Sequence, residues 1–297
     1  MTHVLPLTVL VHEGPMASAY LAAMRLAGYK PERIVQMVYD HDVATGKPLL
    51  KWLPPPVKMS QAEILQNAQQ HFWVREIKKT EAALFEQMSN TIAPALGVSV
   101  EIFDELLQRK EYSEYADDVQ KVMVSGLKAP ELAEALKAFS PTTVLFTGGG
   151  IVPASLLAIE GLKFIHIHPG YLPWVRGGDG LLWSTLVRKC PGATSFYMDP
   201  GIDTGQIIHA AELPAVTFPL AADKRPDDQT LYRALFAYFD PLVRATVLTQ
   251  TLNNLKDQLQ DMMHLPSHAQ LPSEGNTYHF MHPAMRKKAL EKLFPVS

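Results

Sequence analysis

The chain has 297 residues, of which 47% are hydrophobic and 19% are charged. This composition supports a large buried core and argues against a disordered or fibrous protein. Lys and Arg number 27 against 30 Asp and Glu, so the net charge of −3 gives no general attraction for nucleic acid or an anionic membrane. The single cysteine, Cys190, excludes an intrachain disulfide framework and a thiolate zinc cluster.

The N-terminal residues predict no targeting segment. Residues 1–11 are too short and too poor in positive charge for a signal peptide, and the sequence has no run of 18 apolar residues that would span a membrane. We therefore expect a cytoplasmic protein that has no membrane partner.

The first 38 residues predict a βαβ unit. Residues 5–11 are apolar and rich in β-branched side chains, apolar residues recur at helical spacing over 17–28, and residues 34–38 are a second strand candidate. Such a unit implies a parallel sheet. Residues 43–59 are rich in turn formers and contain Pro54-Pro55-Pro56, which we expect to break regular structure.

A helical insertion is predicted over residues 60–115. Ser60-Gln61-Ala62-Glu63 has the form of a capping box, and helix formers dominate the residues that follow it. The apolar residues form stripes that fit two or three helices placed between strands of the sheet.

The alternation of strands and helices resumes after the insertion and predicts an α/β fold with a mostly parallel sheet flanked by helices. The expected elements are strand 119–124, helix 130–139, strand 142–146, helix 153–159, strand 163–167, helix 180–187, strands 193–198 and 206–212, helix 227–258, and a loop-rich tail from 265 with a basic helix at 286–293.

The segment with the strongest candidates for catalytic side chains contains His166 and His168, at the end of a predicted strand. Residues two apart on a strand point to the same side, and open α/β sheets place their sites at the carboxyl ends of strands. Prolines and glycines then define an irregular loop up to Gly180. A pair of core-facing histidines beside a tight turn is the plainer interpretation, but the pairing and the position favour a functional site.

Two further segments follow predicted strands. Asp199-Pro200-Gly201-Ile202-Asp203-Thr204-Gly205 could be only a turn, but an aspartate beside an imidazole would make a pair for acid–base chemistry. Gly148, Gly149 and Gly150 would let a ligand approach the backbone closely. Neither these glycines nor the first turn, His12-Glu13-Gly14-Pro15, matches the phosphate-binding fingerprints, which argues against NAD and ATP.

The stretch from about Thr142 to Pro214 resembles the formyltransferase family that uses 10-formyltetrahydrofolate. The family pattern reads Asn-x-His-Pro-Ser-Leu-Leu-Pro, then an aromatic residue, Arg and Gly, and further along Gly-x-Asp-x-Gly. The matching residues are His166-x-His168-Pro169-Gly170-Tyr171-Leu172-Pro173, Arg176-Gly177 and Gly201-x-Asp203-x-Gly205. The resemblance implies a Rossmann-like formyltransferase fold over residues 1–220, followed by a C-terminal helix and tail, 221–297.

The resemblance also implies roles for individual residues. His168 matches the catalytic histidine, Asp203 the catalytic aspartate, and His166 stands where the family has its catalytic asparagine. The positions implied for binding the folate co-substrate are Gly150, Ile151, Val152, Met198, Asp199, Gly201 and Ile202. We expect Arg176 to bind a carboxylate of the substrate or of the folate.

The implied reaction is transfer of the formyl group to an amine or hydroxylamine-type nitrogen, with no metal. His166 could still donate a hydrogen bond to the oxyanion, yet it also makes His166, His168 and Asp203 a candidate two-His-one-carboxylate metal set. A hydrolase, either a formyltetrahydrofolate deformylase or a metal-dependent enzyme, therefore stays as the alternative, and a binding protein without activity as a third.

The acceptor is expected to be a small metabolite and not a nucleic acid. Ribonucleotide-using relatives have a Gly/Ser-rich first turn that binds phosphate, whereas His12-Glu13-Gly14-Pro15-Met16 carries an acid. The short tail and the net charge of −3 argue against tRNA. The insertion is expected to cover the acceptor pocket, to form a homodimer face, or only to pack on the sheet.

Overall fold

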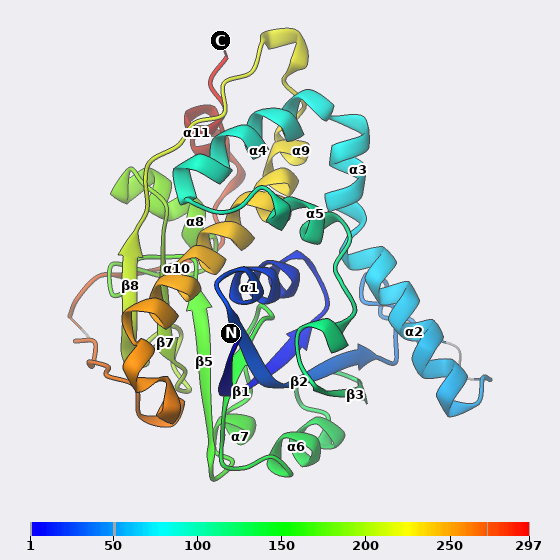
Figure 1. The fold of residues 1–297 in the computed structure, drawn as a ribbon. Helices are drawn as coiled ribbons and strands as arrows, with labels where there is room; N and C mark the ends of the chain where they lie inside the picture. Colours follow the sequence, from blue (N-terminus) through cyan, green and yellow to red (C-terminus); the bar gives the residue numbers. More distant parts are fainter. Residues whose placement is uncertain (1, 50–51, 272, 297) are drawn as a thin grey trace.

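The computed structural model describes residues 2–49, 52–271 and 273–296, in which seven strands form a mixed sheet in the order β3-β2-β1-β4-β5-β7-β8 (Figure 1). The first five strands in this order are parallel, whereas β7 runs antiparallel to β5 and β8 antiparallel to β7. The strands are β1 (His3–His12), β2 (Tyr29–Tyr39), β3 (Asp118–Val124), β4 (Thr142–Phe146), β5 (Leu162–His168), β7 (Gly192–Tyr197) and β8 (Ile207–Glu212). The predicted α/β fold with a mostly parallel sheet is confirmed.

Helices cover both faces of this sheet (Figure 1). They are α1 (Pro15–Leu26), α2 (Pro55–Gln70), α3 (Phe72–Thr80), α4 (Ala82–Leu96), α5 (Glu101–Leu107), α6 (Pro130–Lys137), α7 (Ala154–Leu157), α8 (Gly180–Trp183), α9 (Asp228–Ala234), α10 (Asp240–Asn254) and α11 (Pro283–Leu293). Alternate residues of β1 enter different cores: Val9 packs with α1 and α10, whereas Leu10 packs with α6 and α7. This alternation explains why the central strands are apolar throughout.

The larger core joins distant parts of the sequence. It includes Leu5 near the start of the chain and Phe294 near its end. The expected boundary near residue 220 stays a prediction, because residues from both sides of it share this core. Across the described residues, no helix combines the length and the apolar character that crossing a membrane requires.

The insertion differs from its prediction in two ways. It contains four helices, α2 to α5, instead of two or three, and it begins at Pro55 instead of Ser60. Proline is tolerated in the first helical turn, where its missing N–H leaves no bond unmade, so the proline run starts the helix. Ser60 therefore lies inside α2, where its hydroxyl donates to the Pro56 carbonyl, and the capping-box prediction is wrong. Positions 50 and 51 of the predicted turn-rich stretch lie outside the described residues.

The long helix expected over 227–258 is also divided. After α9, residues Leu235–Phe239 form a π-helical turn that leads into α10, and Lys256–His264 form a 3₁₀ segment. Pro241 lies in the first turn of α10 and cannot donate a backbone hydrogen bond to the preceding turn, which accounts for the irregular π segment there.

Candidate active site

A cavity of about 1140 Å³ lies at the carboxyl ends of β1, β4 and β5. Pro15 lines it from the end of β1, and Gly150 from the end of β4. β1 lies between β2 and β4, so the strand order changes direction there, which is where open α/β sheets bind ligands. All the expected catalytic and folate-binding residues line this cavity; they are Gly150, Ile151, Val152, His166, His168, Met198, Asp199, Gly201, Ile202 and Asp203.

His168 and Asp203 meet in this cavity. The Nδ1 atom of His168 lies 3.3 Å from Oδ2 of Asp203, and its Nε2 donates to the Val175 carbonyl at 2.8 Å. The same Asp203 oxygen accepts from the backbone N–H of Gly177 at 2.8 Å. Burial lowers the pKa of His168, whereas the nearby Asp203 charge acts in the opposite direction. Both ring nitrogens thus face acceptors, so either one can carry a hydrogen, while burial keeps the net pKa of the ring below its ordinary value.

His166 has different partners. Its Nδ1 lies 3.2 Å from the Phe146 carbonyl, which can only accept, so Nδ1 carries the hydrogen. Burial lowers the pKa of His166 to about 3, and the positive charge of Arg244 acts in the same direction. The neutral ring then offers Nε2 as an acceptor. The hydrogen-bond donation to an oxyanion that the sequence suggested does not follow from this tautomer.

Two loops leave apolar side chains open at the cavity. Ile151 is 75% exposed and Ile202 is 53% exposed. Gly150 has a φ of 91°, and a side chain added there would meet nothing within 4 Å, so this backbone is open to a ligand. Asp199 shapes the second loop, because its carboxylate accepts from the Gly201 N–H and the Thr204 hydroxyl. These loops therefore present apolar side chains and open backbone to the cavity, where the flat face of a ligand ring could pack.

Arg176 lies outside the set of residues that line the cavity. It is buried, its Nε donates to Gln270 at 3.0 Å, and its Nη1 donates to the Glu274 carbonyl at 2.8 Å. These bonds join it to the C-terminal tail. Its expected role in binding a carboxylate stays a prediction.

Sequence reasoning missed Arg244, which lines the cavity from α10. Its guanidinium pairs with Asp240 and donates to the Ile167 carbonyl, between the two histidines of β5. An acid and a base four residues apart at the start of a largely buried helix were the available signal.

Residues from three remote segments complete the wall, and most of them are aromatic. The insertion contributes Trp73, α9 contributes Tyr232 and Arg233, and the tail contributes Tyr278 and Phe280. The Arg233 guanidinium lies 3.6 Å from the centre of the Trp73 ring. The insertion therefore lines part of the cavity, and its expected role as the cover of the acceptor pocket stays a prediction.

The histidines and Asp203 do not form the alternative metal set. Within the ranges that the structure describes, no group of three or more His, Cys, Asp or Glu side chains is arranged to hold a metal ion. Nδ1 of His166 and Nε2 of His168 each face a backbone carbonyl instead.

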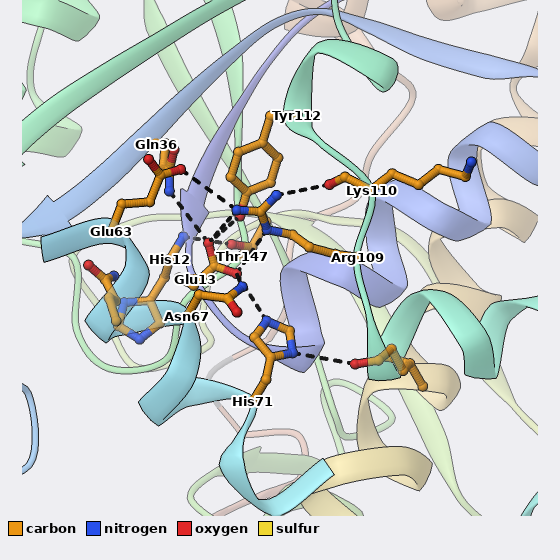
Figure 2. A network of polar contacts seen from close by, with 12 residues as sticks. His12, Glu13, Gln36, Glu63, Asn67, His71, Arg109, Lys110, Tyr112 and Thr147 are labelled. Carbon is orange, nitrogen blue, oxygen red and sulfur yellow. Dashed lines mark hydrogen bonds and ion pairs between the residues drawn. The ribbon is translucent and has the colours of Figure 1, made fainter. Parts of the chain in front are cut away.

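Figure 2 shows how the first βα turn holds the insertion. Glu13 is fully buried and accepts from His71 at 3.0 Å, from Arg109 at 3.1 Å and from Tyr112 at 2.8 Å. Burial alone would raise the pKa of Glu13, but the His71 and Arg109 interactions outweigh it and lower the pKa to about 2. Trp73, two residues beyond His71, lines the cavity.

Comparison with known proteins matches part of the chain to formyl transferases. Residues 100–222 match the family model described as formyl transferase. Methionyl-tRNA formyltransferase of Syntrophus aciditrophicus is 35% identical over 91 residues, which are 30% of this chain and 29% of that protein. The corresponding protein of Caldanaerobacter subterraneus is 29% identical over 130 residues, which are 43% of this chain and 38% of that protein. The chain thus spans about a third of the length of these two relatives.

Solved structures of low sequence identity were also found. A sugar N-formyltransferase from a Shewanella species has a TM-score of 0.44 and 15% identity, covering 99% of this chain and 88% of that one. A 4-N formyltransferase from Francisella tularensis has a TM-score of 0.46 and 12% identity, covering 96% and 85%. The segment matched by the family model contains every expected catalytic and folate-binding residue.

Proposed function

We propose that this chain, whose residues 100–222 match the formyl transferase family model, transfers a formyl group from 10-formyltetrahydrofolate to the amino or hydroxylamine-type nitrogen of a small metabolite. The observation that carries the proposal is the meeting of His168 and Asp203 in a cavity whose two open loops suit a pterin. The bound folate supplies the formyl group, and the remaining chemistry belongs to side chains of this chain.

The proposed roles follow from the proton positions. Neutral His166 offers Nε2 as a hydrogen-bond acceptor that orients the N–H of the attacking amine. The proton that this nitrogen loses as its bond to the formyl carbon forms passes to the departing folate nitrogen. His168, steadied by Asp203, holds the proton that the departing nitrogen requires. Arg244 adds positive charge to the cavity wall, which favours negative charge on the formyl oxygen and disfavours a protonated His166.

The cavity has room for a second ligand beside folate. Its volume of about 1140 Å³ exceeds the roughly 300–1,000 Å³ of ordinary ligand pockets. The wall made by Trp73, Tyr232 and Tyr278 suits the apolar body of an acceptor. These features support a small-molecule acceptor, while the net charge of −3 counts against tRNA.

The activity test measures tetrahydrofolate released from 10-formyltetrahydrofolate in the presence of a panel of small amines and hydroxylamine. We expect release to depend on an added amine. His168→Ala and Asp203→Asn should each lower the rate by about 10²–10⁴-fold, the usual contribution of general acid–base catalysis.

His264→Ala is the matched control, because this histidine also pairs with an aspartate but lies exposed outside the cavity. Release without any amine would identify a hydrolase. Full activity of His168→Ala would contradict the proposed mechanism. Binding of folate without turnover would support the hypothesis of a binding protein without activity.

A further inference from the structure

The C-terminal tail reaches the loop that carries Asp203. The side-chain amide of Gln270 donates to the Asp203 carbonyl at 2.9 Å and to the Gly205 carbonyl at 2.7 Å. Its oxygen accepts from Nε of Arg176, which precedes Gly177. Gly177 in turn donates its N–H to the Asp203 carboxylate. Gln270 thus joins both segments that fix the position of the carboxylate.

Asp203 needs such support because its backbone is unusual. Its φ of 55° lies in the left-handed region, which residues other than glycine adopt rarely and keep where the surroundings support it. The two carbonyls that Gln270 binds lie at Asp203 itself and two residues beyond it. The amide therefore holds the turn that directs the carboxylate toward His168.

The tail is itself fixed at several points. Strand β9 (Asn276–Tyr278) pairs with β6 (Val175–Gly177), and the rings of Trp183 and Tyr278 stack with their centres 4.6 Å apart. The Cβ of any residue in place of Gly177 would lie 2.1 Å from the Tyr278 carbonyl oxygen, so the glycine permits this pairing. The tail is thus held close to the Asp203 loop.

We propose that Gln270 is a positioning residue for Asp203, and that through it the tail forms part of the active site. The inference rests on the proposed function of Asp203. It also gives Arg176 a purpose within the fold, because Arg176 orients the amide of Gln270 by binding its oxygen. Loss of the amide donor should displace the carboxylate from His168 without removing any group that touches the substrates.

The test compares Gln270→Glu with Ser267→Ala. Gln270→Glu keeps an oxygen for Arg176 but replaces the donor with an acceptor that repels both carbonyls. Ser267→Ala removes another hydrogen bond of the tail, which its hydroxyl makes to Gln206 away from Asp203, and serves as the matched control. We expect Gln270→Glu to lower kcat by about 10–100-fold, as loss of a supporting contact usually does, with little change in either KM. The control should keep the wild-type kcat.

The second measurement is an NMR titration of the His168 ring, assigned by comparison with His168→Ala. In Gln270→Met, which removes the donor and adds no charge, the His168 pKa should fall, because the nearby carboxylate that favours the charged ring has moved. Gln270→Met should also lower kcat if Gln270→Glu does not fold, because its side chain has a similar length and no donor. An unchanged His168 titration and an unchanged kcat in a folded variant overturn the proposal. If the wild type transfers no formyl group, the proposed function fails, and the titration alone decides the role of Gln270.

Discussion

His166 and His168 lie two residues apart on the same strand, yet their chemistry differs because their partners differ. His166 directs Nδ1 at a carbonyl and keeps a free Nε2, whereas His168 lies between a carbonyl and a carboxylate. The sequence placed both rings on one side of β5, and both line the cavity. His166 offers an acceptor nitrogen and His168 holds a proton because each ring faces a main-chain carbonyl of another segment.

A first prediction at this scale concerns the pH dependence of stability. The pKa of His166 is about 3 in the folded protein and about 6.5 in an unfolded chain, so the unfolded state binds more protons between these values. The His166 contribution is therefore complete above pH 6.5 and is lost as the pH falls toward 3. His166→Asn should reduce the slope of unfolding free energy against pH by up to about 1.4 kcal/mol per pH unit.

Urea unfolding at a series of pH values between 7 and 4 measures this slope. His264→Asn is the control, since the His264 side chain is 77% exposed. An identical slope in His166→Asn and the wild type would show that the buried ring is not held neutral.

At the scale of elements, one buried ion-pair cluster connects the sheet to the insertion. Glu13 follows β1, His71 joins α2 to α3, and Arg109 follows α5. Three helical segments are thus fixed to the sheet edge beside the cavity (Figure 2). Glu13 stands in the first βα turn, where ribonucleotide-using relatives bind phosphate. Its role in holding the insertion could not be inferred from its position in the sequence alone.

Glu13→Gln should therefore destabilise the fold. Removing one partner of a buried ion pair leaves the other charge without compensation and typically costs about 3–5 kcal/mol. Glu114→Gln breaks an exposed pair with Lys110 four residues away and should cost at most about 1 kcal/mol. Chemical denaturation of both variants at pH 7 measures the difference, and equal costs would contradict the assigned role of the cluster.

At the scale of the whole molecule, the cavity is assembled from remote parts of the chain. The carboxyl ends of β1, β4 and β5 supply its floor, while the insertion, α9, α10 and the tail supply its walls. Because folate would contact several of these parts at once, its binding should stabilise the entire fold.

Tetrahydrofolate at 100 times its Kd should raise the free energy of unfolding by about 2.7 kcal/mol. At the same tetrahydrofolate concentration, Ile202→Ser should show a smaller stabilisation, because the substitution reduces the apolar surface that the pterin covers. Val4→Ser is the control, because Val4 is also 53% exposed but lies outside the cavity. Thermal unfolding with and without ligand measures both variants, and equal stabilisation of the two would contradict the proposed folate loop.

The sequence by itself determined the alternation of strands and helices, the direction of the first strands and the segments that hold His166, His168 and Asp203. These features depend on local periodicity, turn residues and a contiguous motif, all of which can be read from residues that are close together in the sequence. Strand β4 has the predicted bounds for this reason. The predicted start of the helix at Ser60 and the prediction of one continuous helix over 227–258 were wrong. Both errors involve proline, which can begin a helical turn as well as end one.

Only the tertiary structure decided which partners those side chains have. Gln270 reaches Asp203 from 67 residues away, Arg244 reaches the backbone between the histidines from α10, and Arg109 reaches Glu13 across 96 residues. No local pattern encodes such contacts, since they arise when packing brings separate segments together. Proton positions, charge compensation and the cavity wall therefore follow from the folded arrangement of the chain.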